Sequence, residues 1–108
     1  MKSVVWVLVN TNSQKEAEKI GRAVLKKRLA ACFGLIAKIK SVYFWPPKTN
    51  QLETSRGPLL VLETLPKNYP QISRLVKRLH SDKTPFIGKL DIKEVDGDFY
   101  KWLAGAVK

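Results

Sequence analysis

The chain contains very few of the residues that bind transition metals or form covalent crosslinks. Its 108 residues include one cysteine, Cys32, and one histidine, His80. A single cysteine excludes a disulfide within the chain and the paired-cysteine site of a soft-metal carrier. One cysteine and one histidine are also too few for a tetrahedral transition-metal site. A site of that kind would need ligands from several copies of the chain.

Acidic residues are also scarce, because nine Asp and Glu stand against 20 Lys and Arg, for a net charge of +11. No Ser-His-Asp or Cys-His constellation and no pair of catalytic carboxylates is evident, so we expect a protein that is not an enzyme. The positive charge permits binding to nucleic acid or another polyanion. The basic residues are spread along the chain without a dense block, which favours a solvated surface with no specific partner.

Long apolar runs are absent as well. No run of about 18 apolar residues exists, so we expect no transmembrane helix and no membrane partner. The apolar run near the N-terminus ends at Asn10 without a small-residue cleavage site, which favours a buried strand over a signal peptide. We therefore expect a cytoplasmic protein with a single domain over residues 1–108.

The first third of the chain predicts a strand followed by a helix. The apolar run from Val4 to Val9 predicts a central strand that is buried on both faces. Ser13 and Glu16 match a capping box at the start of a helix. One face of that helix is apolar at helical spacing, in the positions Ala17, Ile20, Gly21, Val24 and Leu25.

The middle of the chain predicts a long hairpin. The segment from Cys32 to Trp45 is mostly β-forming, and Gly34 predicts a bulge or bend within it. The polar stretch from Lys48 to Arg56 predicts the tip of the hairpin. A short buried strand, Leu59–Leu62, is predicted to follow the tip.

The last third predicts a helix, a strand and a final helix. Asn68 and Pro70 are typical of a helix start, and Phe86–Val95 predicts the last strand. Asp98 is predicted to be the N-cap of a C-terminal helix that has one apolar face. The order β-α-β-β-α-β with an extra helix predicts an α+β fold, the ferredoxin-like sandwich.

Five segments of the chain resemble a known family. They are Leu29–Cys32 after the first helix, Ser41-x-Tyr43-x-Trp45, Leu59–Thr64, Leu75–His80 with Pro85, and Tyr100–Leu103. Over nearly the whole chain, they resemble the CutA family of divalent-cation tolerance proteins. The resemblance implies a homotrimer in which the long hairpin of each subunit joins a neighbouring sheet. It also implies a non-enzymatic role in metal-ion tolerance or small-ligand signalling, as in the similar PII-type trimers, without an obligatory cofactor.

Three residues depart from the pattern of the family near its inter-subunit cleft. Glu63 stands where a basic residue is usual, and Ser81 and Asp82 replace a usual Pro-Tyr pair after the histidine. These substitutions predict that any cleft chemistry of this chain differs from that of its relatives.

The candidate metal ligands are His80 and Cys32, and copper is the first metal to test because imidazole nitrogen suits it. The structural alternatives are that His80 caps the end of its helix and that Cys32 is a small buried residue between helix and strand.

Tyr43 and Trp45 lie two residues apart, on the same face of their predicted strand. They are interpreted either as packing anchors between subunits or as the lining of a ligand cleft together with Lys48. Besides other copies of the chain, the expected partners are a divalent metal or a small anionic ligand.

A basic nucleic-acid- or polyanion-binding module on the same fold is the alternative function. The third strand of an RNA-recognition motif carries aromatic residues on which bases stack. The matching segment here, Arg56–Val61, has no aromatic residue. Nucleic acid is therefore the less favoured partner.

Overall fold

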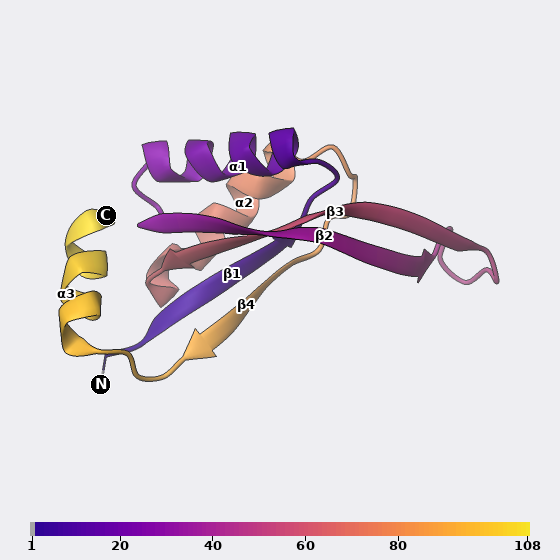
Figure 1. Ribbon diagram of the computed structural model, residues 1–108. Coiled ribbons are helices and arrows are strands. Elements are labelled where there is room, and N and C mark those ends of the chain that lie inside the picture. The colour runs from indigo at the N-terminus through magenta and orange to yellow at the C-terminus, as the bar shows by residue number, and fades with distance from the viewer. Residues whose placement is uncertain (1) are drawn as a thin grey trace.

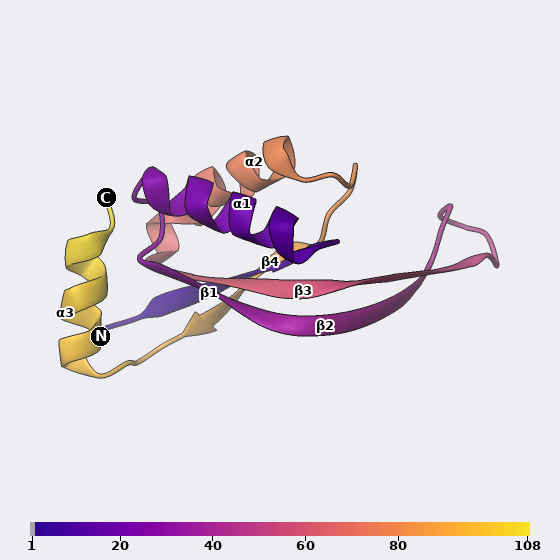
Figure 2. The same ribbon diagram turned by 45° about the horizontal axis from the view of Figure 1, so that its top comes forward.

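The computed structural model describes residues 2–108, which form one antiparallel sheet with two helices on one of its faces (Figures 1 and 2). The elements are β1 (Val4–Asn10), α1 (Gln14–Lys26), β2 (Cys32–Phe44), β3 (Leu52–Thr64), a short 3-10 helix η1 (Pro66–Asn68), α2 (Tyr69–Leu79), β4 (Ile87–Ile92) and α3 (Gly97–Ala106). The strand order is β2-β3-β1-β4, with every neighbouring pair antiparallel. This arrangement confirms the predicted α+β ferredoxin-like order with an extra C-terminal helix. Within residues 2–108, no helix is long and apolar enough to cross a membrane.

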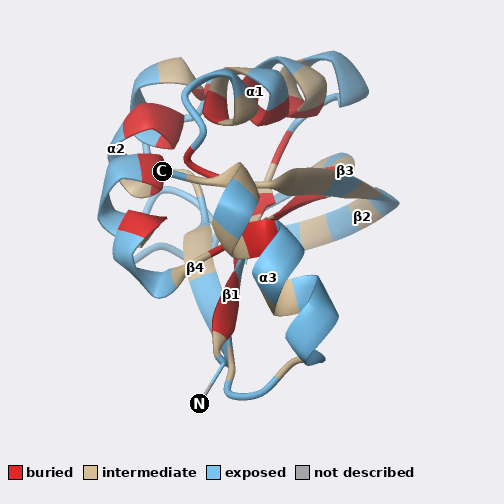
Figure 3. Cartoon of the chain, turned by 90° about the vertical axis from the view of Figure 1, so that its left-hand side faces the viewer, coloured by how far each residue is buried: buried red, intermediate tan, exposed pale blue. Residues whose placement is uncertain are grey.

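The hydrophobic core lies between the sheet and the layer formed by α1 and α2 (Figure 3). Val5, Val7 and Val9 of β1 point into this core, because every second residue of a strand lies on the same face. Burial of one such side chain stabilises the fold by about 1.5–3 kcal/mol. The helices add their predicted apolar stripes and β3 adds two leucines, so that the fully buried members include Ile20, Val24, Leu60, Leu62, Ile72 and Val76.

The prediction that β1 is buried on both faces was wrong for the single chain. Trp6 points away from the helices and is 36% exposed, and its indole N–H donates to Glu63 Oε2 at 3.0 Å. The helices α1 and α2 cover one face of the sheet, so that the alternate residues of β1 face outward (Figure 2). The second apolar face of β1 is therefore available for contact with another surface.

The start of α1 confirms half of the predicted capping box. Ser13 is the N-cap, and its Oγ accepts a hydrogen bond from the Glu16 backbone N–H at 3.0 Å. The Glu16 carboxylate does not return this bond to Ser13. It accepts instead from the backbone N–H groups of Asn12, at 2.9 Å, and of Ser81, at 2.8 Å. Glu16 thus joins the start of α1 to the loop after α2.

The hairpin of β2 and β3 is longer and has a shorter tip than the sequence predicts. The segment Leu52–Arg56, which lies in the predicted tip, continues β3, because Leu52 pairs with Phe44 and Arg56 pairs with Lys40. Polar residues can form this part of the strand because no core covers it. The distal half of the hairpin projects beyond the helices (Figure 1).

The irregularity in β2 is not at Gly34, which pairs normally with Val61. It lies between Ile36 and Ile39, where β2 has one more residue than β3, and Lys38 in this bulge has a φ of 60°. One inserted residue moves the following side chains to the opposite face of a strand. Odd-numbered β2 residues therefore face the helices before the bulge and face away from them after it.

The C-terminal helix α3 lies at the end of the molecule opposite the hairpin tip (Figure 1). Its N-cap is Asp96 rather than the predicted Asp98, because Asp96 Oδ2 accepts from the N–H groups of Asp98 and Phe99. Only Leu103 of its apolar face is buried, and Trp102 is 53% exposed.

Candidate functional site

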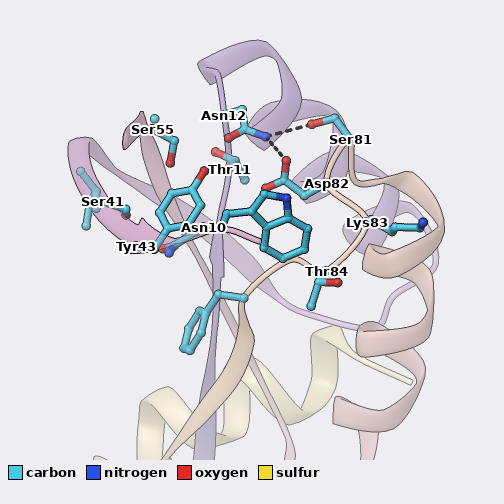
Figure 4. Close-up of a pocket in the computed structure, with 14 residues that line it drawn as sticks. Asn10, Thr11, Asn12, Ser41, Tyr43, Ser55, Ser81, Asp82, Lys83 and Thr84 are labelled. Carbon is cyan, nitrogen blue, oxygen red and sulfur yellow. Dashed lines mark hydrogen bonds between the residues drawn. The ribbon is translucent and has the colours of Figure 1, made fainter. Parts of the chain in front are cut away.

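A pocket of about 490 Å³ lies where the hairpin leaves the helix-covered part of the sheet. We call it the hairpin-base pocket. Five segments form it: the end of β1, the loop between β1 and α1, the distal halves of β2 and β3, and the loop between α2 and β4 (Figure 4). Its lining consists of Asn10, Thr11, Asn12, Ile39, Ser41, Tyr43, Trp45, Ser55, Gly57, Ser81, Asp82, Lys83, Thr84 and Phe86.

The bulge in β2 determines which side chains of the hairpin face this pocket. Every second residue from Ile39 to Trp45 lines it, as the alternation of a strand requires. Ser41 lies directly opposite Ser55 of β3, so the two side chains share one face. Before the bulge the odd-numbered residues Phe33 and Leu35 pack against the core. Without the bulge, Ser41 and Tyr43 would point to the helix side of the sheet.

A glycine allows the end of β1 to approach β3 and close one side of the pocket. A Cβ atom on Gly57 would lie 1.9 Å from the backbone oxygen of Thr11, which is far inside van der Waals contact. The buried Thr11 hydroxyl donates to the carbonyl of Pro58 at 2.7 Å and holds this approach. The residue at position 57 therefore has no room for any side chain.

A polar network orders the opposite side of the pocket. The amide nitrogen of Asn12 donates to Ser81 Oγ at 3.0 Å and to Asp82 Oδ1 at 2.9 Å (Figure 4). Burial alone would raise the pKa of Glu16, but hydrogen bonds from Ser81 and Asn12 lower it overall. The charged carboxylate of Glu16 is thus the stable form that fixes Asn12 and Ser81.

His80 belongs to the same network and has a structural role there. Its side chain is completely buried, and Nε2 lies 2.6 Å from the carbonyl oxygen of Asn10. Nδ1 accepts the backbone N–H of Asp82 at 2.9 Å, so Nε2 carries the hydrogen and donates to Asn10. His80 is the C-cap residue of α2, although its ring holds the neighbouring loop rather than the helix carbonyls. Both ring nitrogens are engaged within the single chain.

Cys32 is half-buried at the start of β2, opposite Glu63. Burial raises the pKa of its thiol, and the charge and hydrogen bond of Glu63 raise it further. Glu63 pairs with Trp6, whereas His80 contacts Asn10 at the other end of β1, so the structure does not bring Cys32 and His80 together. In residues 2–108 no three His, Cys, Asp or Glu side chains gather as a metal site would require.

The structure brings two of the three predicted cleft residues together. Tyr43 and Trp45 line the hairpin-base pocket, whereas Lys48 lies in the hairpin tip and does not; Lys83 is the lysine of the lining. The alternation that predicts Tyr43 and Trp45 would also have found Ser41. No local pattern marks Asn12 or Ser55, because they reach the pocket through the tertiary arrangement.

Comparison with known proteins gives one family. Residues 5–106 match the family model described as CutA1 divalent ion tolerance protein. The divalent-cation tolerance protein CutA of Thermus thermophilus is 30% identical over 97 residues, which cover 90% of this chain and 91% of that protein. The human protein CutA is also 30% identical, over 94% of this chain and 55% of its own length. A CutA structure from Archaeoglobus fulgidus, described as periplasmic, superimposes with a TM-score of 0.90 at 27% identity, covering 97% of this chain and 99% of that one.

Proposed function

Because this chain belongs to the CutA1 divalent ion tolerance family, we propose that it acts in divalent-ion tolerance as a ligand-binding homotrimer without catalysis. The match of the family model to residues 5–106 carries this proposal. The hairpin-base pocket, at the root of the element that would join subunits, is the binding site that the geometry favours. A strain that lacks its own CutA and is sensitive to copper tests the role. Expression of this chain should restore growth in copper, and unchanged sensitivity would contradict the proposal.

The homotrimer is supported by apolar side chains that the single chain leaves in solvent. They lie on the projecting hairpin and on the uncovered face of the sheet, and include Trp6, Ile36, Val42, Phe44, Leu52 and Leu90, each at least 36% exposed. Exposed apolar surface of this extent marks an interaction site. Light scattering over a range of protein and salt concentrations should give a constant mass of three chains. A monomer would mean that the hairpin does not join a neighbouring sheet.

Copper is the metal we propose to test first, although residues 2–108 of one chain do not form a site for it. A copper site would therefore need ligands from several copies. Titration of Cu²⁺ into the intact protein, followed by calorimetry, should show saturable binding that is lost when the oligomer dissociates. Loss of binding in Cys32→Ser would identify Cys32 as a ligand. In His80→Asn, a loss of binding would count as loss of a ligand only where urea unfolding shows unchanged stability, because the His80 ring also holds the loop at Asp82. Absence of saturable binding to the wild type would refute the copper proposal.

We also propose a cytoplasmic location, which the free Cys32 supports because reducing compartments keep thiols unpaired. Fractionation of the host cells tests this, and recovery outside the cytoplasm would overturn it.

Binding of a polyanion is the second candidate function. The exposed sides of α1 and α2, which lie next to each other over the sheet, carry Lys15, Lys19, Arg22, Lys26, Arg74, Lys77 and Arg78 (Figure 1). Of these cations, Arg22 forms an ion pair with Glu18, with 3.7 Å between its guanidinium nitrogen and the carboxylate oxygen. The sequence of α2 contains no acidic residue. Affinity for duplex DNA should then fall steeply between about 50 and about 200 mM salt. No binding at the lower salt concentration would exclude this candidate.

A further inference from the structure

We propose that the hairpin-base pocket binds an uncharged, hydroxylated ring compound, such as a nucleoside or a simple glycoside. This inference rests on the proposed ligand-binding role of the pocket and names the chemical class of its ligand. Four properties of the lining lead to it: its charge, its aromatic faces, its hydrogen-bonding groups and its size.

The charge of the pocket is balanced, in contrast to the charge of the whole chain. The chain has a net charge of +11, yet the lining contains one cation, Lys83, next to one anion, Asp82. A phosphate or polycarboxylate site normally has clustered Arg or Lys, or several converging backbone N–H groups. The predicted second cation, Lys48, lies outside the pocket. The lining therefore favours a neutral ligand over the small anion that the sequence suggested.

Aromatic side chains from two segments of the chain line the pocket. Tyr43 and Trp45 come from β2 and are 42% and 45% exposed, and Phe86 comes from the segment before β4. Partly exposed aromatic rings offer large contact areas to a ring-shaped ligand. A nucleobase would stack on such a face in the way that bases stack on aromatic platforms. The apolar face of a sugar ring would pack there too.

The hydrogen-bonding groups of the pocket suit hydroxyls. Ser41, Ser55 and Thr84 carry hydroxyl groups that can both donate and accept. Asp82 Oδ1 accepts from Asn12, while Oδ2 has no partner within residues 2–108. A carboxylate only accepts hydrogen bonds, and its bonds from hydroxyls are short and strong. Asp82 is therefore the group that we expect to bind ligand hydroxyls.

Asp82 is already held in place before any ligand binds. Its backbone N–H donates to Nδ1 of the buried His80 ring, and its carboxylate accepts from the side-chain amide of Asn12. The backbone N–H of Asn12 in turn donates to the Glu16 carboxylate. Groups that are fixed in advance lose less entropy on binding. The volume, about 490 Å³, lies within the usual range for small-molecule pockets.

Calorimetry on the intact protein tests the proposal with three probes: adenosine, methyl β-glucoside and ATP. Binding of adenosine alone indicates a nucleoside site, binding of the glucoside alone indicates a glycoside site, and binding of both supports the shared chemistry. ATP should bind no more tightly than adenosine at physiological salt, where unspecific attraction is screened. Absence of binding to both neutral probes at millimolar concentration would overturn the proposal. So would an affinity for ATP more than about tenfold higher than for adenosine.

Two pairs of variants locate the binding. Trp45→Leu should weaken binding of the positive probe by about tenfold or more, whereas Trp102→Leu, which changes a similarly exposed indole on α3, should leave it within about twofold. Asp82→Asn keeps the Oδ1 acceptor for Asn12 but removes the negative charge that would bind ligand hydroxyls. It should weaken binding of the same probe by about tenfold. Asp91→Asn, on the exposed part of β4, is its control. Equal affinities within each pair would overturn the proposal.

The copper titration on the same preparation separates this inference from the proposed function. Binding of a neutral probe without copper binding or copper tolerance would refute the metal role and leave the ligand class standing. Copper binding without a neutral probe would refute the ligand class alone.

Discussion

The two halves of the β2–β3 hairpin are held by different forces. In the proximal half, Leu60 and Leu62 of β3 are fully buried under the helices. In the distal half, from Ile39 to Gly57, no residue is buried, although backbone pairing between the strands continues to Phe44 and Leu52. The same two strands thus pass from a dry core to a two-stranded ribbon, and an isolated ribbon of this kind is only marginally stable. The distal half therefore needs contacts outside its own ladder.

The hairpin-base pocket lies at the boundary between these two halves. The bulge turns Ser41 and Tyr43 toward the pocket, and Gly57 allows the end of β1 to reach β3. The Glu16 network then fixes the facing loop. At this boundary, the end of β1 and the loop after α2 are held by the core and its hydrogen bonds, whereas the distal hairpin has no packing partner within residues 2–108 of the single chain.

The most direct test of this difference changes one leucine in each half of β3. Leu60→Ala should lower the free energy of unfolding by about 2–5 kcal/mol, because Leu60 is fully buried and the change leaves a cavity. Leu52→Ala, at a side chain that is 62% exposed, should cost no more than about 0.5 kcal/mol. Urea unfolding at concentrations low enough to dissociate the oligomer measures both. Equal losses would mean that the two halves are stabilised alike.

A smaller effect is expected at the boundary itself. Gly57→Ala should lower the free energy of unfolding by about 1–3 kcal/mol, because its Cβ would overlap the Thr11 carbonyl and push β1 away from β3. Gly34→Ala is the matched control on β2, since nothing lies within 4 Å of its Cβ position. Thermal unfolding of the two variants is the measurement. A neutral Gly57→Ala would show that the close approach is not required.

The Glu16 network should respond to both mutation and pH. Glu16→Gln removes charged acceptors and should cost about 1–2 kcal/mol at neutral pH. Since the folded pKa of Glu16 is lowered, its stabilising effect is fully present above the ordinary value of 4.5 and is lost as the pH falls through the folded pKa. The difference in the free energy of unfolding between wild type and Glu16→Gln, measured by urea unfolding, should therefore become smaller in acid.

The control for Glu16 is Glu18→Gln on the same helix. Glu18 is 40% exposed and forms an ion pair with Arg22, so its replacement should change stability by less than about 0.5 kcal/mol. A constant gap for Glu16→Gln from neutral to acid pH would contradict the role of its charge.

The smallest expected effect concerns the thiol in the proximal half. Glu63→Gln should lower the pKa of Cys32, because burial and the Glu63 carboxylate together raise it. Alkylation of Cys32 by iodoacetamide at mildly alkaline pH should then be faster than in the wild type, since the thiolate is the reactive form. Glu53→Gln in the distal half should not alter this rate. If Glu63→Gln and Glu53→Gln accelerated the alkylation equally, the net charge of the protein, and not the contact of Glu63 with Cys32, would set the thiol pKa.

Local residue patterns predicted most elements but not their limits in the hairpin. The stripes of α1 and α2 are regular because each must cover the same core, so spacing alone reveals them. Leu52–Arg56 is mostly polar, which predicts a hairpin tip, and only its pairing with Lys40–Phe44 makes it a strand. Likewise the bulge could not be placed by composition, since Gly34 is the more typical residue for it and Lys38 is the one with positive φ.

The sequence by itself determined the ferredoxin-like order, the apolar stripes that build its core and the membership of the family, because these depend on short-range spacing and on motifs. It also placed Tyr43 and Trp45 on one strand face. The tertiary structure alone decided that Asn12, Ser55 and Asp82 meet these aromatic residues while Lys48 does not. It also decided that His80 and Cys32 lie apart. The physical reason is that the pocket arises from contacts between segments up to about 70 residues apart, such as that of Asn12 with Asp82, which no local pattern records.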